Sequence, residues 1–179
     1  YRSDQWKEKL IAANATQVVL VVATEPGFSD ELISRALVAV RHERMRAVIV
    51  LNKCDLDAGL PAARAQLAPF AALDLPVVEL SALTDPGPLA PLLAGQVSVL
   101  VGQSGMGKSR TVNALVMNEV ARVGEISASL GIGTHTTTSE RLYRMDRDTA
   151  IIDTPGFQSF GLFHLTEAQI AEAIPEFRP

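Results

Sequence analysis

One octapeptide constrains the fold of this chain more than any other feature. Residues 102–109, Gly-Gln-Ser-Gly-Met-Gly-Lys-Ser, match the pattern G-x-x-x-x-G-K-[ST]. An apolar segment (residues 96–101) precedes the octapeptide, and a segment whose apolar residues have helical spacing (residues 108–117) follows it. The pattern carries meaning only in this strand–loop–helix context. The sequence therefore predicts a phosphate-binding loop within an α/β fold.

The residue types of this phosphate loop suit the binding of phosphate groups. Its three glycines allow the backbone to curl so that successive N–H groups point inward, and the following helix adds the positive end of its dipole. Lys108 is expected to reach the β- and γ-phosphates and to act in catalysis, while the Ser109 hydroxyl is expected to ligate Mg²⁺. The predicted nucleotide contacts of this segment are Gly102, Gln103, Ser104, Gly105, Met106, Gly107, Lys108, Ser109 and Arg110.

A second motif, the base loop at residues 52–55 (Asn-Lys-Cys-Asp), indicates which base the nucleotide carries. It follows an apolar segment, at the end of a predicted strand, where open α/β sheets place ligand-binding groups. Guanine presents N1–H and N2–H₂ as adjacent donors, and the carboxylate of Asp55 can accept both, whereas adenine lacks this pair. We expect Asn52 to join the base loop to the phosphate loop, and the stem of Lys53 to cover a face of the base. Cys54 occupies the variable position and is interpreted as structural.

Two shorter motifs gain meaning from their positions. Ser81 and Ala82 follow the next predicted strand and fit an SA motif, in which a backbone N–H contacts the guanine oxygen. Residues 153–156 (Asp-Thr-Pro-Gly) end another predicted strand and match DxxG. Asp153 is expected to hold Mg²⁺ through water, and the Gly156 N–H is expected to sense the γ-phosphate. Together with the first two motifs, these complete the set found in guanine-nucleotide-binding proteins.

A glycine- and hydroxyl-rich segment, residues 131–138 (GIGTHTTT), lies between the phosphate loop and DxxG, where a first switch is expected. One of its threonines is predicted to complete the Mg²⁺ shell and to bond the γ-phosphate. We favour Thr137, with Thr136 as the alternative. The region from about residue 118 to 133 is expected to be mobile without GTP, because the γ-phosphate contacts that order a switch are then missing.

The residue after DxxG raises a question about catalysis. Many GTPases place a water-orienting Gln there, but this chain has Phe157, which neither donates nor accepts a hydrogen bond. His135 is the candidate for positioning the water, because its pKa suits proton chemistry near neutrality and it neighbours the switch threonines. The alternative is that His135 is a loop residue that contacts a partner.

The remaining sequence predicts a three-layer P-loop NTPase fold. Valine-rich segments typical of buried strands alternate with segments of helical periodicity, which indicates a mainly parallel sheet covered on both faces. The predicted strands are residues 17–23, 46–51, 76–80 and 96–101, and the predicted helices are residues 30–42, 62–72 and 108–117. Residues 141–145 and 149–153 flank a turn and indicate an antiparallel edge hairpin. Residues 84–91 are predicted to be a loop, and Thr166 with Gln169 forms a capping box that opens a last helix.

Composition narrows the class of protein. The chain has 179 residues, of which 47% are hydrophobic and 20% charged, as in a single globular domain. Its net charge of −4 argues against a broad nucleic-acid-binding face. No apolar run approaches the roughly 18 residues of a membrane-spanning helix, so we expect no membrane association. The single cysteine, Cys54, excludes an intrachain disulfide and a cysteine-based zinc site, and favours a reducing, cytoplasmic setting.

The order of the motifs is circularly permuted. The base motif and SA come first, followed by the phosphate loop, the switch threonines and DxxG, whereas most GTPases begin with the phosphate loop. This order, with GQSGMGKS, NKCDL, HTTT, DTPGF, the closing PEFRP and the early AANATQ, resembles the RsgA (YjeQ) family of bacterial GTPases that depend on the small ribosomal subunit. The resemblance extends over essentially the whole chain.

The resemblance implies a late maturation factor of the 30S subunit, with GTP/GDP and Mg²⁺ as cofactors and GTP hydrolysis stimulated by the subunit. It also implies an OB-fold before Tyr1 and a zinc-binding domain after Pro179, so that residues 1–179 are the GTPase domain excised from a longer protein. Contacts with the 30S subunit and its 16S rRNA are then expected mainly through those flanking domains, and zinc only in the second of them. We expect the chain to be a monomer.

Two other functions remain open at this point. The chain could be a nucleotide-gated binding module, in which GTP or GDP sets the affinity for the ribosome and hydrolysis is incidental; Phe157 favours this alternative. It could also be a related permuted GTPase that acts on the large subunit, although the HTTT segment argues against this. Turnover measured with and without 30S subunits separates the enzyme from the module.

Overall fold

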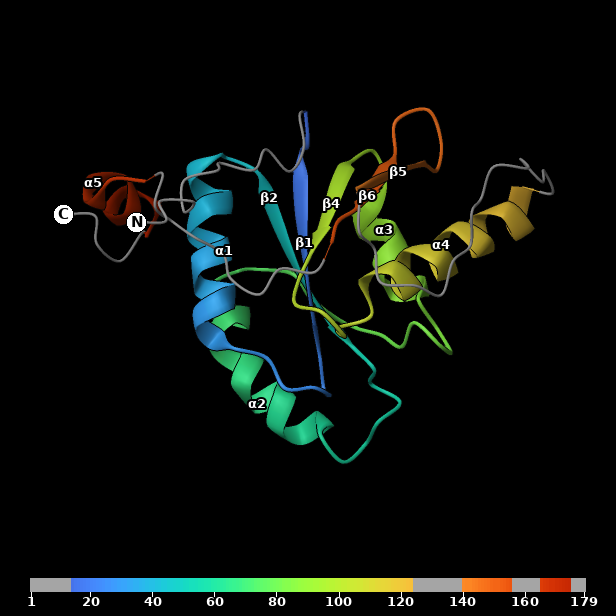
Figure 1. Cartoon of the computed structure of the whole chain (residues 1–179), viewed down its shortest axis with the longest axis horizontal. Helices are drawn as coiled ribbons and strands as arrows, with labels where there is room; N and C mark the ends of the chain where they lie inside the picture. The colour runs from blue at the N-terminus through green and yellow to red at the C-terminus, as the bar shows by residue number, and fades with distance from the viewer. Residues whose placement is uncertain (1–13, 124–139, 156–164, 175–179) are drawn as a thin grey trace, which may run out of the picture.

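The computed structural model describes residues 14–123, 140–155 and 165–174, and the side chains of α4 only as far as residue 118. Within these ranges six strands form one sheet, flanked by helices (Figure 1). The strands are β1 (Gln17–Ala23), β2 (Arg46–Asn52), β3 (Val77–Glu79), β4 (Val97–Val101), β5 (Arg141–Arg144) and β6 (Ala150–Asp153). The helices are α1 (Asp30–His42), α2 (Leu60–Ala71), the 3₁₀ turn η1 (Gly87–Leu89), α3 (Ala90–Leu93), α4 (Lys108–Val123) and α5 (Glu167–Ala173).

The sheet is mainly parallel, with the strand order β3-β2-β1-β4-β6-β5. β1 lies between β2 and β4, and its last residue, Ala23, is level with Asn52 at the end of β2. Only β5 runs antiparallel, against β6 at the edge of the sheet. The predicted parallel sheet with an antiparallel edge hairpin is therefore confirmed. All parallel strands end at the same edge, and the loops that carry the sequence motifs leave the sheet there.

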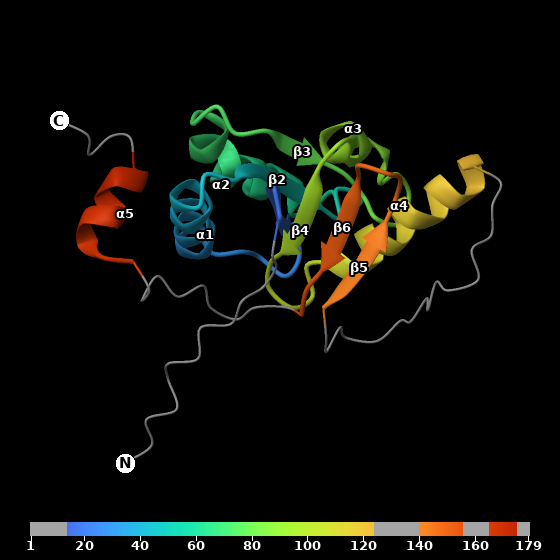
Figure 2. The same cartoon turned by 90° about the horizontal axis from the view of Figure 1, so that it is seen from above.

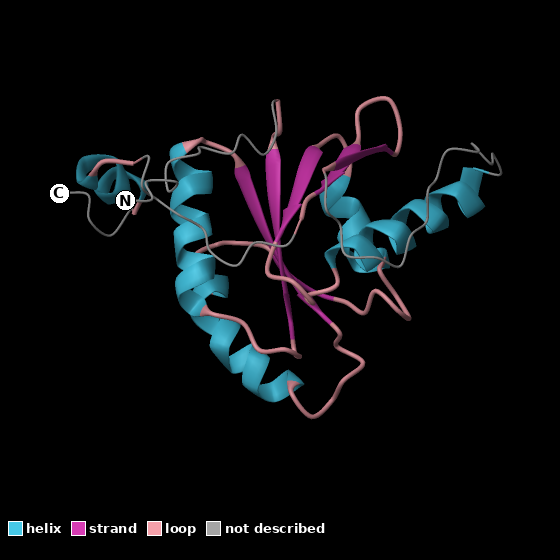
Figure 3. Ribbon diagram, viewed as in Figure 1, coloured by secondary structure: helices cyan, strands magenta, loops and turns pink. Residues whose placement is uncertain are grey.

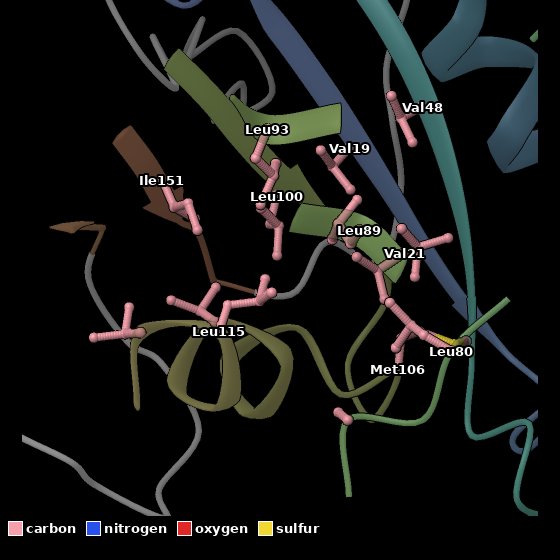
Figure 4. Close-up of a cluster of buried hydrophobic side chains, with 14 of the residues drawn as sticks. Val19, Val21, Val48, Leu80, Leu89, Leu93, Leu100, Met106, Leu115 and Ile151 are labelled. Carbon is pink, nitrogen blue, oxygen red and sulfur yellow. The ribbon is translucent and has the colours of Figure 1, made fainter. Parts of the chain in front are cut away.

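Helices cover both faces of the sheet, as Figures 2 and 3 show. Because successive side chains of a strand point to opposite faces, β1 contributes Val19 and Val21 to one core and Val18, Leu20 and Val22 to the other. The first core packs against α3 and α4 (Figure 4). The second core packs against α1 and α2. Burial on both faces explains the uninterrupted apolar sequence of this strand.

The two main differences from the sequence-based expectations concern α4 and residues 84–91, whereas the other predicted bounds differ from the observed ones by at most two residues. Helix α4 continues to Val123 instead of ending near residue 117, because residues 118–123 contain neither glycine nor proline to stop it. The first six residues of the segment expected to be mobile are thus helical, and the rest of that segment lies outside the described residues. Residues 84–91, predicted as a loop, contain η1 and the start of α3, because proline is tolerated in the first turn of a helix.

The last helix, α5, begins as predicted. The Thr166 hydroxyl accepts a hydrogen bond from the Gln169 N–H (3.3 Å), and the Gln169 side chain accepts one from the Thr166 N–H (2.8 Å). This reciprocal pair is the capping box. The helix lies beside α1 (Figure 1). Across the described parts of the chain, no helix combines the length and the apolar character needed to cross a membrane.

Candidate nucleotide-binding site

Three motif segments leave the sheet at the same edge. The base loop follows β2, the phosphate loop follows β4, and Asp153 ends β6. The register places Leu20 of β1 beside Val101 of β4, and Leu100 of β4 beside Asp153 of β6. Since β2, β1, β4 and β6 are parallel and follow one another in the sheet, the segments after β2, β4 and β6 converge despite their permuted order in the chain.

Asn52 joins the base loop to the phosphate loop, as the sequence predicts. Its side chain is 1% exposed, and its Nδ2 donates a hydrogen bond to the Met106 carbonyl at 2.9 Å. Its Oδ1 accepts hydrogen bonds from the N–H groups of Lys53 (2.8 Å) and Ala82 (3.0 Å). A buried amide that satisfies three backbone groups holds three loops in one arrangement.

The glycines of the phosphate loop are required by geometry. Gly102, Gly105 and Gly107 have φ angles of +153°, +83° and +90°, a range that side chains disfavour. A Cβ atom on Gly102 would lie 2.2 Å from the carbonyl oxygen of Val21, and one on Gly107 would lie 2.3 Å from Nδ2 of Asn52. The loop therefore needs bare backbone at both its beginning and its end.

Met106 anchors the phosphate loop in the core. Its side chain is 1% exposed and belongs to the buried cluster on the α3 and α4 side of the sheet, near Val21 and Leu80 (Figure 4). Only the backbone of Met106 is therefore available to a nucleotide. Its carbonyl accepts the hydrogen bond from Asn52, which leaves the N–H for a ligand.

Lys108 is a buried cation at the start of α4. It is 6% exposed, and its Nζ donates to the carbonyl oxygens of Gly102 (2.8 Å) and Gln103 (3.0 Å). Burial lowers the pKa of Lys108 below its ordinary value, and the nearby carboxylate of Asp153 opposes part of that shift. An anionic ligand in the loop would compensate the desolvated charge, so the site fits phosphate groups.

The oxygen donors beside the loop suit Mg²⁺. Ser109 is the second residue of α4, and Asp153, at the end of β6, is 2% exposed. Hydroxyl and carboxylate oxygens are the ligands that this ion prefers, often through water. Elsewhere in the described parts of the chain, no group of three or more His, Cys, Asp or Glu residues could hold a metal ion.

Thr154, which sequence reasoning passed over, holds the start of DxxG in place. It is fully buried, and its Oγ1 donates a 2.6 Å hydrogen bond to the carbonyl of Leu100 in β4. This bond ties the segment that carries Asp153 to the strand that carries the phosphate loop. The available signal was a hydroxyl residue directly after a buried strand.

Cys54 also holds the base loop in place. The Cys54 N–H donates to the carbonyl of Leu80 (3.1 Å), and its Sγ lies 3.2 Å from the carbonyl of Leu51. Burial raises the pKa of the Cys54 thiol, which agrees with a structural and unreactive cysteine. Asp55, the next residue, is exposed, so its carboxylate is accessible to a ligand.

An ion pair supports the same region from α2. Arg64 donates from Nε and Nη2 to the two carboxylate oxygens of Glu79, at 2.8 and 2.7 Å. The hydrogen bonds from Arg64 lower the pKa of Glu79 below its ordinary value. This fork fixes the end of β3, two residues before Ser81, against the helix that follows the base loop.

The SA dipeptide is hydrogen-bonded to Asn52 and to its own turn. The Ala82 N–H donates to Oδ1 of Asn52, and the Ser81 N–H donates to the Asp85 carbonyl at 3.3 Å. Both N–H groups are thus hydrogen-bonded within the protein, and the contact of this motif with a guanine oxygen remains a prediction. A guanine oxygen would have to share the Ala82 N–H with Asn52.

Several predicted residues are not placed by the structure. His135, Thr136, Thr137, Gly156 and Phe157 lie outside the described residues, so their roles remain predictions. Arg110, in the first turn of α4, is exposed, and the described part of the chain offers it no hydrogen bond or ion pair. It is thus accessible to a nucleotide.

Comparison with known proteins agrees with this geometry. The sequence profile described as RsgA GTPase matches residues 1–163. The chain is 54% identical to the small ribosomal subunit biogenesis GTPase RsgA of Burkholderia mallei, over 183 aligned residues, and 52% identical to that of Nitrosospira multiformis. Each alignment covers all of this chain, which spans 58% and 57% of the length of those two proteins.

Solved structures have the same fold. YjeQ from Thermotoga maritima matches with a TM-score of 0.72 and 29% identity, covering 92% of this chain and 56% of that one. YloQ, a circularly permuted GTPase, matches with a TM-score of 0.65 and 24% identity, covering 92% and 53%. These matches confirm the permuted P-loop architecture. With a family profile over most of its length and relatives that share more than half of its residues, the chain belongs to the RsgA GTPase family.

Proposed function

We propose that this chain is one GTPase domain, residues 1–179, that binds GTP and GDP with Mg²⁺ and hydrolyses GTP. The observation that carries the proposal is the set of three hydrogen bonds by which Asn52 joins the base loop, the SA turn and the phosphate loop. Such a joint fixes the distance between a base-reading carboxylate and a phosphate cradle. Family membership supports the same activity.

In this proposal each residue has a stated task. Asp55 accepts the two adjacent donors of guanine, and the stem of Lys53 covers a face of the base. The backbone of the phosphate loop and the Lys108 ammonium bind the phosphates. Ser109, Asp153 through water, and Thr137 hold Mg²⁺, which when bound neutralises charge on the β- and γ-phosphates. The Gly156 N–H senses the γ-phosphate.

We further propose a role in late maturation of the 30S subunit. The named relatives are small ribosomal subunit biogenesis GTPases, and the chain spans 58% of the first of them. Contacts with the 30S subunit and its 16S rRNA then lie mainly in flanking regions, since the chain itself carries a net charge of −4. We place a zinc-binding region there too, and we propose a cytoplasmic monomer.

The test combines binding and turnover. Calorimetry with GTP and ATP should show at least a hundredfold preference for GTP, on the order expected when two hydrogen bonds to a carboxylate are lost. GTP hydrolysis should rise strongly when purified 30S subunits are added and should be unchanged by 50S subunits. Equal affinity for ATP and GTP would contradict guanine recognition, and stimulation by 50S subunits alone would indicate a large-subunit factor.

A second candidate function is a nucleotide-gated binding module. Phe157 favours it, because this side chain cannot orient a water as the usual Gln does. In that case the affinity for 30S subunits would differ between GTP and GDP, while turnover would respond little to the subunit. The turnover experiment therefore distinguishes the two candidates.

His135→Ala should lower 30S-stimulated turnover and leave nucleotide affinity unchanged. The reason is that His135 is proposed to position the attacking water, a task that typically contributes about a hundredfold to ten-thousandfold in rate. Stimulated turnover and mant-GDP affinity, measured on the same preparations, check this. His42→Ala, at the end of α1, is the matched control. Normal stimulated turnover in the His135 variant removes this residue from the mechanism.

A further inference from the structure

Residues 24–26 (Thr-Glu-Pro) connect β1 to α1 and belong to none of the sequence motifs; we name them the bridging turn. β1 pairs with β2 on one side and with β4 on the other. The base loop follows β2 and the phosphate loop follows β4. The bridging turn, which follows β1, therefore lies between these two loops.

On the base-loop side the contacts are hydrogen bonds. The Thr24 N–H donates to the Asn52 carbonyl (3.3 Å), and Oγ1 of Thr24 donates to the Lys53 carbonyl (3.0 Å). Nζ of Lys53 donates in turn to the carbonyl of Glu25. Thr24 is 8% exposed, so water competes little for its hydroxyl.

On the phosphate-loop side the contact is steric. A Cβ atom built on Gly105 would lie 3.7 and 3.8 Å from Cδ and Cγ of Pro26, which is ordinary van der Waals distance. The start of α2 also lies close, since a Cβ atom on Gly59 would be 3.1 Å from the Thr24 carbonyl oxygen. The bridging turn thus lies close to the phosphate loop and to the start of α2, besides its hydrogen bonds to the base loop.

Lys53 shows why the bridging turn matters. Its φ angle is +63°, a left-handed conformation that is unfavourable for a residue with a side chain. Such a conformation persists when its surroundings determine it. Here the N–H of Lys53 donates to Oδ1 of Asn52, and its carbonyl accepts from Oγ1 of Thr24 and, within the base loop, from the Leu56 N–H at 2.9 Å. Both backbone polar groups of the strained residue are therefore bound by side chains.

We infer that Thr24 is a positioning residue for base recognition. By holding the Lys53 carbonyl, its hydroxyl sets the direction in which the chain continues to Asp55, two residues later. Asn52 fixes one end of this left-handed turn, and Thr24 fixes the other. The inference rests on the proposed function, because it concerns how the carboxylate of Asp55 meets guanine.

The test compares Thr24→Val, which keeps the shape and removes the hydroxyl, with Thr24→Ser, which keeps the hydroxyl. Thr24→Val should weaken GDP binding about threefold to tenfold, the range for one lost hydrogen bond whose acceptor, the Lys53 carbonyl, keeps the bond from the Leu56 N–H. Inosine diphosphate offers Asp55 one donor instead of two, so its affinity should fall by a smaller factor than that of GDP. Inorganic pyrophosphate, which contacts only the phosphate loop, should bind the variant with an affinity within about twofold of that for wild type. Thr24→Ser should restore GDP affinity to within about twofold.

Three results would overturn the inference. The first is a Thr24→Val variant that binds GDP as tightly as wild type does. The second is a variant whose affinities for GDP, inosine diphosphate and pyrophosphate all fall by the same factor, since that would be a general structural effect. The third is a wild-type chain that binds ADP as tightly as GDP. This result would overturn the proposed function as well, whereas the first two results would overturn only the role of Thr24. If Thr24→Val does not fold, Thr24→Ala removes the hydroxyl without placing a methyl group against the Lys53 carbonyl, and the same outcomes decide.

Discussion

Asp55→Asn should exchange the guanine preference of this chain for a preference for xanthine. The carboxylate at this position is exposed at the end of a loop whose preceding residues are tightly bound, so the substitution changes hydrogen-bonding chemistry without disturbing packing. An Asn side chain can accept only one of the two adjacent donors of guanine, and its amide group faces the other donor. Xanthine has an oxygen in place of the amino group, and the same amide can donate to it.

The expected loss of GDP affinity is at least about a hundredfold, because two hydrogen bonds to a charged group are each worth about 1.5–3 kcal/mol. Xanthosine diphosphate should bind the variant more tightly than the wild type. Isothermal titration of both diphosphates against both chains measures the exchange. Asp57→Asn changes another exposed carboxylate, two residues further on, and should alter neither affinity. A variant at position 55 that keeps its preference for GDP would contradict base recognition by this carboxylate.

The sequence predicted the elements whose signals are local. β1 and α1 have the predicted boundaries. An uninterrupted valine-rich run is typical of a buried strand, and an amphipathic segment that opens with Asp30 is typical of a helix. The end of α4 was misplaced, since nothing in residues 118–123 breaks a helix. The short helix α3 was missed, because the proline-rich residues 84–91, which lead into it, have the composition of a loop.

The candidate site, too, was predicted where its signals are local and missed where they are not. The motifs located the phosphate loop and the base loop, since each consists of neighbouring residues with a known chemical task, and the task of Asn52 in its motif indicated that it joins the two. Thr154 and Thr24 escaped notice because their partners, Leu100 and Lys53, are distant in sequence and become neighbours only through strand pairing. The engagement of the Ala82 N–H by Asn52 is of this kind too. Hydrogen bonds between strands set the fine geometry of the site, and they depend on register.

Gly107→Ala should disrupt both folding stability and nucleotide binding. The new Cβ atom would lie 2.3 Å from Nδ2 of Asn52, so the amide has to move, and its bonds to the Met106 carbonyl and the Ala82 N–H are lost. Each buried group left unsatisfied costs about 1–3 kcal/mol. The φ angle of +90° adds strain of about 1–2 kcal/mol for any residue with a side chain. The total is a large part of the 5–15 kcal/mol by which domains are typically stable.

Gly105→Ala distinguishes the effect of backbone strain from that of a steric clash. Its φ angle of +83° is nearly the same, but its Cβ atom would meet only the Pro26 ring, at 3.7 Å. This control should lower the thermal midpoint by a few degrees, and Gly107→Ala by more than about 10 °C, at about 2–4 °C per kcal/mol for a chain of this size. GDP affinity should fall at least about a hundredfold in Gly107→Ala and clearly less in Gly105→Ala, because only Gly107→Ala displaces the amide that joins base loop and phosphate loop. Equal effects in the two variants would mean that backbone strain, and not the Asn52 joint, limits both stability and binding.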